Sequence, residues 1–369
     1  MTASRAAPAR TSSTGPVSYA ETEEQRRQLL ALALSNMPFL GPTSRLRAMR
    51  RLTASRLRSM SPAGVGELRQ RATSAGQDRP LQSGSHWLGV AERSVESLTR
   101  LGVGCIFLWQ PSYPRWLREV HDPPLVLYCR GRLPDPAATP VAVVGTRGPT
   151  GRGRESAFRL GYDLALAGIP VVSGLARGVD IAAHRGAVAG GQEGDRCATM
   201  GVLGCGIDQI YPQSSRELCR RLLEVGCVIS EYPPGVPPLQ HHFPMRNRII
   251  AGLGAATVVV EAPARSGALI TADCANAEGR EVMVHADLLS SGRSAGTRAL
   301  NAQGAAAVAD VEQLRRHTGA ALARSQPARA AAAARPTQPE PPQDWRAAGE
   351  WLVAGLRTES AAYVAGRGQ

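Results

Sequence analysis

The chain has 369 residues, a formal net charge of +13 and a hydrophobic fraction of 43%. This size allows two domains and at least one sizeable core, and the basic excess, carried by arginine without any lysine, favours a polyanionic partner such as nucleic acid. The seven cysteines form no C-x-x-C pair, which argues against a disulfide framework or a zinc site. Long apolar runs and a secretory signal are also missing, so we expect a cytoplasmic protein without a membrane span.

The N-terminal third is expected to be helical. Residues 1–20 contain no acidic residue, and we interpret them as a disordered tail rather than a transit peptide. Residues 21–100 are predicted to form a small helical domain of the helix-hairpin-helix or SAM-like type, beginning with a helix over 21–36. The segment PFLGP precedes a basic helix, which suits either a phosphate-binding hairpin or a plain packing unit.

The remaining chain divides into four segments by composition. Residues 101–135 indicate a connector with one or two strands, and residues 136–318 indicate a large α/β domain. Residues 319–345 are rich in alanine and proline and are typical of a linker, and 346–369 offer at most one short helix. A C-terminal winged helix is not evident.

The α/β domain is predicted from apolar strands that alternate with helical stretches. The strands are VAVVG, PVVSG, ATMGVLG, CVISE, ATVVVE and EVMVH. Strands that are apolar on both faces imply a parallel sheet between two helix layers, which is a doubly wound, extended Rossmann-like fold. Right-handed crossovers place the loop after every strand at one rim, where open α/β sheets bind ligands.

Several loops at this rim carry glycine, hydroxyl groups and arginine. The first strand ends in a G-x-x-G-x-x-G turn, which differs from the dinucleotide fingerprint, and the second strand ends in Ser173 rather than an acid, so an NAD enzyme is disfavoured. Asp180 is interpreted as a helix cap, and Tyr211 either stacks on a base or closes its loop.

The run from His241 to Leu253 is the most informative. Phe243 precedes Arg246, Asn247 and Arg248 at an expected helix start, which combines a stacking face with phosphate donors. Alternatively, Phe243 packs inward and Asn247 fixes the turn. The candidate DNA- and phosphate-binding residues are therefore Gly145, Thr146, Arg147, Ser173, Gly174, Arg177, Gly178, Gly204, Gly206, Phe243, Arg246, Asn247, Arg248, Ser266, Gly267 and Thr271.

Catalytic chemistry is not indicated by spacing. The pair His241 and His242 has no third ligand at metal spacing, and no loop supplies a Ser/His/Asp triad or two facing carboxylates. We expect neither a metal nor a cofactor, and not an enzyme. The main rival is a Rossmann-type nucleoside-monophosphate phosphoribohydrolase, in which a Glu such as Glu261 acts beside a P-G-G-x-G-T loop that this chain lacks.

The motifs VAVVGTR, SGLARGVDIAAHRGA, VLGCGIDQIYP, ISEYPPG, FPMRNRIIAGL, VVVEAPARSGALITA and GREV occur in this order between residues 141 and 284. Together they resemble the bacterial DNA-processing protein A (DprA, or Smf) family. The resemblance implies a dimeric single-stranded DNA-binding protein that protects incoming strands during natural transformation and loads the recombinase RecA. It also implies that the glycines, hydroxyls and arginines of these motifs, with Phe243, form the DNA pocket.

Four residues at three places in the chain depart from the family pattern. Thr146 stands where the family usually has serine, which keeps the hydroxyl. The usual Pro-Gly is replaced by His285 and Ala286, and Arg298 replaces the asparagine of Gly-Thr-Asn. These last changes concern the end of the expected pocket.

Overall fold

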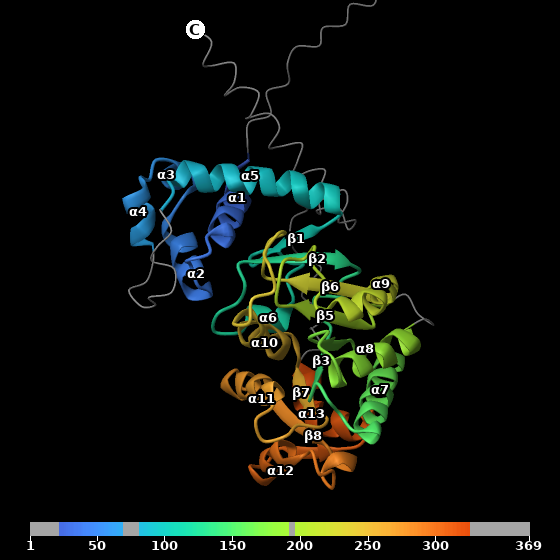
Figure 1. Cartoon of the computed structure of the whole chain (residues 1–369). Coiled ribbons are helices and arrows are strands. Elements are labelled where there is room, and N and C mark those ends of the chain that lie inside the picture. The colour runs from blue at the N-terminus through green and yellow to red at the C-terminus, as the bar shows by residue number, and fades with distance from the viewer. Residues whose placement is uncertain (1–21, 69–80, 192–195, 325–369) are drawn as a thin grey trace, which may run out of the picture.

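The computed structural model describes residues 22–68, 81–191 and 196–324 (Figure 1). The expected tail over 1–20 and the C-terminal segment 346–369 lie outside the described residues. The N-terminal part consists of α1 (Glu23–Asn36), α2 (Pro42–Arg51), α3 (Ala54–Arg58), α4 (Pro62–Glu67) and α5 (Gly84–Leu101). None of the helices in the described ranges is long and apolar enough to cross a membrane.

The first helix begins at a capping box. The Thr22 hydroxyl accepts from the Gln25 amide at 3.2 Å, and the Gln25 side chain accepts from the Thr22 amide at 2.8 Å. On α5, Leu88, Ala91 and Val95 recur at helical spacing and are buried against α1 and α3. These helices pack in an apolar core that also contains residues of the second part, such as Tyr128 and Leu222.

A single nine-stranded sheet forms the second part, with the order β1-β2-β6-β5-β4-β3-β7-β8-β9. All strands from β6 to β9 in this order run parallel. Their bounds are β3 (Val141–Val144), β4 (Val171–Ser173), β5 (Thr199–Leu203), β6 (Gly226–Ser230), β7 (Ala256–Val259), β8 (Glu281–His285) and β9 (Ala306–Val308). The predicted Rossmann-like fold is confirmed. Strands β4 to β6 are added on one side of β3 and strands β7 to β9 on its other side, so the order of the strands changes direction between β3 and β7.

The connector completes the sheet on one side. Strands β1 (Gly104–Phe107) and β2 (Val126–Gly131) form an antiparallel pair that joins β6, with the short helix α6 (Arg115–Arg118) between them. The expected connector therefore belongs to the sheet instead of lying beside it. It also carries the N-terminal helices, since Phe107 and Tyr128 pack into the same core as α1 and α5.

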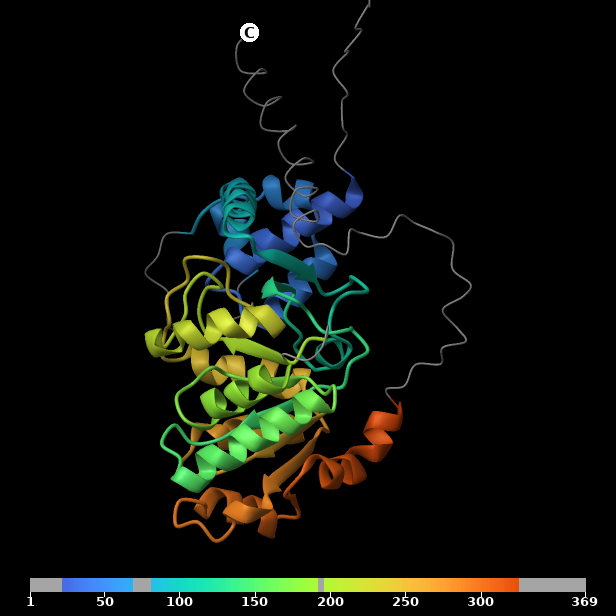
Figure 2. The same ribbon diagram turned by 90° about the vertical axis from the view of Figure 1, so that its right-hand side faces the viewer.

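Two helix layers cover the parallel strands. The strand residues alternate between them: Val141 and Val143 pack against α7 and α8, while Ala142 and Val144 pack toward α10. One layer contains α7 (Gly151–Leu166), α8 (Val179–Gly190), α9 (Arg216–Val225) and α13 (Val311–Arg324). The other contains α10 (His242–Leu253), α11 (Gly267–Ala277) and α12 (Ala295–Ala302). Figure 2, the view turned by 90°, shows α7 lying across one face of the sheet. Helix α13 lies beside β9, at the edge of the sheet.

Two element boundaries differ from the sequence-based expectation. Helix α10 begins at His242, five residues before the expected start at Asn247, because Pro244 falls in its first turn, where a missing amide hydrogen does no harm. Helix α13 continues to Arg324, beyond residue 318, at which the expected domain ended.

Buried charges join the two parts. Glu231, which directly follows β6, is 4% exposed and lies 2.5 Å from the Arg248 guanidinium of α10. Its other oxygen lies 3.7 Å from Arg45 of α2. Arg248 also donates to the Asp122 carbonyl of the connector at 2.7 Å. The N-terminal helices are therefore held against the loop that follows β6.

Glycines permit the close packing of α7 on α8. A methyl group at Gly186 would overlap the carbonyl oxygen of Phe158, and one at Gly161 would overlap the carbonyl oxygen of Ala183. Backbone atoms cannot move aside as a flexible side chain can, so each position requires glycine.

We predict that Gly186→Ala lowers the free energy of unfolding by at least about 1–3 kcal/mol, the usual cost of overpacking. The matched control is Gly319→Ala in α13, where a methyl group has no atom within 4 Å. Since alanine favours the helix, this control should gain about 0.5–1 kcal/mol. Urea unfolding measures both, and equal stabilities would contradict the close packing.

Candidate nucleic-acid interface

The predicted site residues lie on the loops that follow the parallel strands and on the helices that these loops begin. Because the carboxyl ends of parallel strands meet at one edge, the structure gathers them at one rim of the sheet. Direct contacts join neighbouring loops: the Val179 amide donates to the Thr146 carbonyl at 3.2 Å, and the Asn247 side chain donates to the Gly267 carbonyl at 3.3 Å.

The first loop, residues 145–150, is held from inside by Glu261. This fully buried carboxylate accepts from the Thr150 amide at 2.8 Å, from the Thr150 hydroxyl and from the Ser291 hydroxyl at 2.5 Å. The Thr150 hydroxyl in turn caps α7 by accepting from Gly153. The amides of Thr150 and Gly153 at the start of α7 therefore have internal partners and are not free for an external phosphate.

Arg147 stands on the outside of this loop. Its side chain is exposed, whereas Thr146 and Gly145 are half-buried. Gly145 packs so closely on Val179 and on the Glu261 carbonyl that a methyl group there would clash. The loop thus presents a guanidinium on a backbone that has little freedom.

The second loop, residues 174–178, is shaped by Asp180 in the first turn of α8. Its carboxylate accepts from the amides of Gly174 at 3.1 Å and Ala176 at 3.4 Å. The expected role as the cap of α8 was wrong, because Gly178 is the N-cap residue and Asp180 instead folds the preceding loop. Gly178 has φ +90° and packs against Thr146, which leaves Arg177 exposed at the rim.

Ser173 lies beneath this loop. It is fully buried, and its hydroxyl donates to the Val143 carbonyl at 2.7 Å. This bond crosses from β4 to β3, so the hydroxyl holds two strands together and points away from the surface.

Arg246 occupies an internal position. The side chain is 5% exposed and donates to the Gly174 carbonyl at 2.8 Å and to the Val202 carbonyl. Burial lowers the pKa of Arg246, and the nearby Asp180 carboxylate opposes this change. The guanidinium therefore ties α10 to the ends of β4 and β5, and it would have to leave these carbonyls to reach a phosphate.

The Arg248 guanidinium is likewise bonded to groups inside the protein. Burial tends to lower the pKa of Arg248, but the carboxylates of Glu231 and Asp122 raise it above its ordinary value. Of the three polar residues predicted at the start of α10, only Asn247 remains near the surface, where it bridges to α11.

Two aromatic rings stand over the third loop, residues 204–212. The rings of Phe243 and Tyr211 are 5.4 Å apart at 38°, and Tyr211 is 49% exposed. Phe243 is half-buried and lies on Gly204, where a methyl group would approach its ring to 2.9 Å. Gly206 is buried beneath the chain at Pro233 and Val236. One edge of the Phe243 ring thus packs on Gly204, and the rings of Phe243 and Tyr211 together form an apolar surface at the rim.

The loop after β7 leads into α11. Ser266 caps this helix by accepting from the Ala268 amide at 3.3 Å, Gly267 is exposed and Thr271 is buried. Sequence reasoning omitted two further arginines here: Arg265 is exposed beside Ser266, and Arg293 donates to the Gly148 carbonyl at 2.7 Å. Their signal in the sequence was an arginine in the loop after a strand, as at Arg147 and Arg177.

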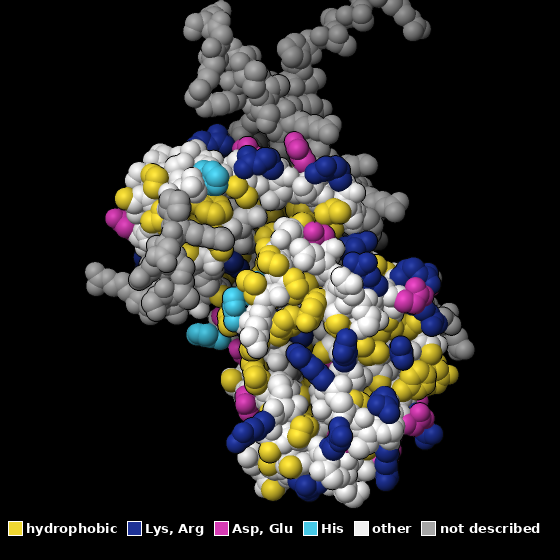
Figure 3. All heavy atoms as spheres, viewed as in Figure 1, with side chains coloured by type: hydrophobic (Ala, Val, Ile, Leu, Met, Phe, Trp, Pro, Cys, Tyr) yellow, Lys and Arg dark blue, Asp and Glu magenta, His cyan; other side chains and the backbone are white. Residues whose placement is uncertain are grey.

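The rim arginines face solvent together. In the view of Figure 3, several separate basic side chains lie among apolar and uncharged ones over the middle of the sheet-bearing half, and acidic side chains lie mainly toward its outline. Arg147 is close enough to Arg246 to help lower the pKa of Arg246. A positive surface with buried, already paired carboxylates attracts an anionic ligand.

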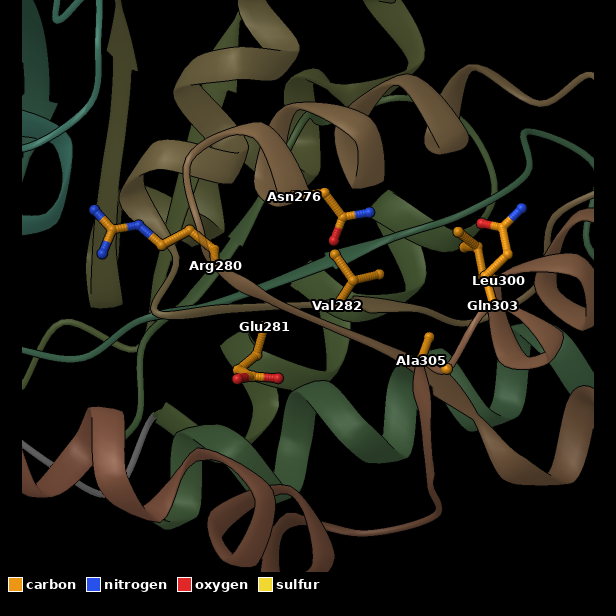
Figure 4. Close-up of a pocket in the computed structure, with 8 residues that line it drawn as sticks. Asn276, Arg280, Glu281, Val282, Leu300, Gln303 and Ala305 are labelled. Atoms are coloured by element: carbon orange, nitrogen blue, oxygen red, sulfur yellow. The ribbon is translucent and has the colours of Figure 1, made fainter.

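Other parts of the described chain have fewer features of a ligand-binding site than the rim has. A pocket of about 240 Å³ opens where β8 begins, at the opposite end of the sheet, and Figure 4 shows Arg280 pointing away from its other lining residues. Arg280 donates to the Trp116 carbonyl at 2.9 Å. Within the described ranges, no group of His, Cys, Asp and Glu is arranged to hold a metal ion.

Comparison with known proteins decides the family. The model of the family described as DNA recombination-mediator protein A matches residues 104–319. The chain belongs to this family. The match covers the antiparallel pair, the parallel sheet and the rim, and it confirms the resemblance found in the sequence motifs.

Curated relatives carry DNA-processing names. Protein Smf from Synechocystis is 44% identical over 176 residues, which are 47% of this chain and 43% of the relative. DNA processing protein DprA from Bacillus subtilis is 35% identical over 223 residues, which are 60% and 73% of the two chains. This chain therefore spans less than half of the first relative and about three quarters of the second.

Two solved structures share the fold. DNA processing protein A from Streptococcus pneumoniae aligns with a TM-score of 0.60 and 29% identity over 78% of this chain and 96% of its own. The Helicobacter pylori protein, whose structure concerns its single-stranded DNA binding mode, aligns with a TM-score of 0.50 and 26% identity over 60% and 96%. Family members thus have this arrangement of sheet and rim.

The buried Asp180 predicts a pH dependence of stability. Burial raises the pKa of Asp180 to about 6 from 3.8, so the folded state binds the proton more tightly than the unfolded state. The contribution of this group is greatest below pH 4 and falls as the pH rises through 6. We expect the stability of the wild type minus that of Asp180→Asn to fall by up to about 3 kcal/mol between pH 4 and pH 7.

His184 titrates in the opposite sense, because burial lowers its pKa to about 4. It is present in both proteins, so the difference between wild type and variant removes its effect. Urea unfolding across pH measures this difference. A difference that is constant, or that grows with pH, would show that the Asp180 carboxyl is not held as the structure indicates.

Proposed function

We propose that this chain binds single-stranded DNA along the rim and acts as a recombination mediator in the cytoplasm. The observation that carries the proposal is the pair of exposed arginines, Arg147 and Arg177, on adjacent loops whose backbones are fixed to each other. The bond from Val179 to Thr146 and the packing of Gly178 on Thr146 limit the movement of both loops. Guanidiniums on loops whose backbones move little bind successive phosphates with less loss of conformational entropy than guanidiniums on mobile loops.

The chemistry of the rim favours a single strand. Phosphates would lie along Arg147, Arg177 and Arg265, and unpaired bases would stack on the pair Phe243 and Tyr211. Stacking does not depend on base identity, which suits binding without strong sequence preference. The single-stranded DNA binding described for the Helicobacter pylori relative supports this ligand.

Family membership supports the finer parts of the proposal. In this account the protein protects the strand, transfers it to a RecA-type recombinase and acts as a homodimer. The seven cysteines are all free thiols, which suits a reducing cytoplasm. The rival phosphoribohydrolase is disfavoured, because the Glu261 carboxylate is fully buried and bonded to Thr150 and Ser291 rather than open to a substrate.

We expect Arg147→Ala and Arg177→Ala each to weaken binding of a single-stranded oligonucleotide. Each lost phosphate contact should make the slope of log affinity against log salt shallower by about 0.7, and the double variant by about 1.4. Fluorescence anisotropy at several salt concentrations measures affinity and slope together.

Arg196→Ala is the matched control, since Arg196 is exposed and lies beside Gly168, at the end of the sheet opposite the rim. The net charge changes equally in all single variants. If the control weakens binding as much as Arg147→Ala, the effect is one of overall charge and the assignment of the rim is wrong.

The two roles of Phe243 can be separated by Phe243→Leu, which keeps an apolar contact with Gly204 but removes the aromatic face. We expect affinity to fall by about 1–3 kcal/mol for each base that loses its stacking partner, with an unchanged salt slope. The control is Phe158→Leu on α7, whose ring stacks with Tyr162 and is 36% exposed. Wild-type affinity of Phe243→Leu would mean that the ring only packs.

A further inference from the structure

The N-terminal domain carries a second basic surface, separate from the rim. Residues 37–66 contain six arginines and no acidic residue. Arg45 is buried against Glu231, but the other arginines are exposed. We define the α2–α3 face by these exposed residues, which are Arg47, Arg50, Arg51, Arg56 and Arg58.

Helix geometry places three of them together. Arg47, Arg50 and Arg51 are separated by three and four positions, so they share one face of α2. The opposite face, with Ser44, Arg45 and Ala48, is buried. Figure 1 shows α2 as the lowest of the N-terminal helices in that view, with α3 and α4 above it.

Counter-charges are scarce at this face. Among the described residues, Arg47, Arg50, Arg51 and Arg56 form no ion pair, and Arg58 lies 3.8 Å from Glu92 in an exposed pair. Like charges held this close on a short helix repel one another and lower its stability. A polyanion would remove this repulsion.

We propose that the α2–α3 face binds the phosphate backbone of double-stranded DNA. A duplex presents phosphates in a rigid, regular array, and a row of guanidiniums on a rigid helix suits such an array. The partner is nucleic acid rather than a lipid surface, because the exposed large apolar residues of the described chain all lie outside α2 and α3. The apolar residues of these helices are directed into the core.

A single strand suits this face less well than a duplex. Its binding without sequence preference combines phosphate contacts with stacking on aromatic rings. Among the described residues, the ring nearest to α2 in the chain is that of Phe39, which is half-buried and meets the half-buried ring of Trp87 edge to face at 5.9 Å. In the part of the chain that the structure describes, the face therefore offers charge, and the ring beside it is packed rather than open for stacking.

The ion pair between Arg45 and Glu231 fixes this face relative to the rim. Arg45 precedes Arg47 by two residues, and Glu231 lies at the carboxyl end of β6. Two basic surfaces with different preferences are thus held in one rigid arrangement. The duplex proposal does not depend on single-strand binding at the rim, and each can fail without the other.

The test compares wild type with the triple variant R47Q/R50Q/R51Q on a blunt 20-base-pair duplex and on a single-stranded 20-mer across salt. We expect duplex affinity to fall at least tenfold and its log-log salt slope to become shallower by about 2.7, the value for three contacts. Single-strand affinity should remain within twofold of wild type. R56Q on α3 should lower the duplex slope by about 0.9, and thermal melting verifies folding.

The charge-matched control is R159Q/R196Q/R220Q, which removes three exposed arginines from other surfaces. Unchanged duplex binding in the α2 variant, or an equal loss in the control, would overturn the proposal. An equal loss of single-strand affinity would instead show that the face extends the rim. Loss of binding to phosphatidylserine vesicles with duplex affinity unchanged would assign the face to a membrane.

Discussion

The buried guanidinium of Arg246 is the interaction on which the rim depends. It donates to the carbonyls of Gly174 and Val202, at the ends of β4 and β5, and it faces the carboxylate of Asp180. Asp180 in turn fixes the amides of the second loop. Breaking such a buried set by removing one partner usually costs about 3–5 kcal/mol, because the remaining charge stays without water. The exposed arginines can therefore stand on loops that hardly move.

Acidic and basic side chains near the rim differ in how deeply they are buried. Three carboxylates near the rim are buried and paired internally: Glu261 holds the first loop, Asp180 the second and Glu231 the start of the loop after β6. Asp208 of the third loop is exposed. Exposed positions carry guanidiniums, among them Arg147, Arg177 and Arg265. Exposed arginines outnumber exposed acids on the rim loops because these three acids are turned inward, and this arrangement favours a polyanion over a small substrate that needs an acid or base.

Local patterns in the sequence predicted the strands and the rim well. Runs such as VAVVG are apolar on both faces, and this property alone indicates buried parallel strands whose loops meet at one edge. Which arginines face solvent was not predictable, because Arg248 pairs with Asp122, 126 residues away, and Arg246 bonds to Val202, 44 residues away. Ser173 was predicted to contribute its hydroxyl to the site, but this hydroxyl donates to the Val143 carbonyl of β3, 30 residues earlier. Only the folded chain shows these pairs.

The central claim is that a single strand lies on the rim loops, and amide hydrogen exchange of the full chain with and without a single-stranded oligonucleotide tests it most directly. We expect slower exchange in residues 145–150, 174–178, 204–212 and 242–248, which belong to three loops and one helix end at the same edge of the sheet. Slower exchange confined to the pocket at the start of β8, or to the N-terminal helices, with the rim loops unchanged, would contradict it.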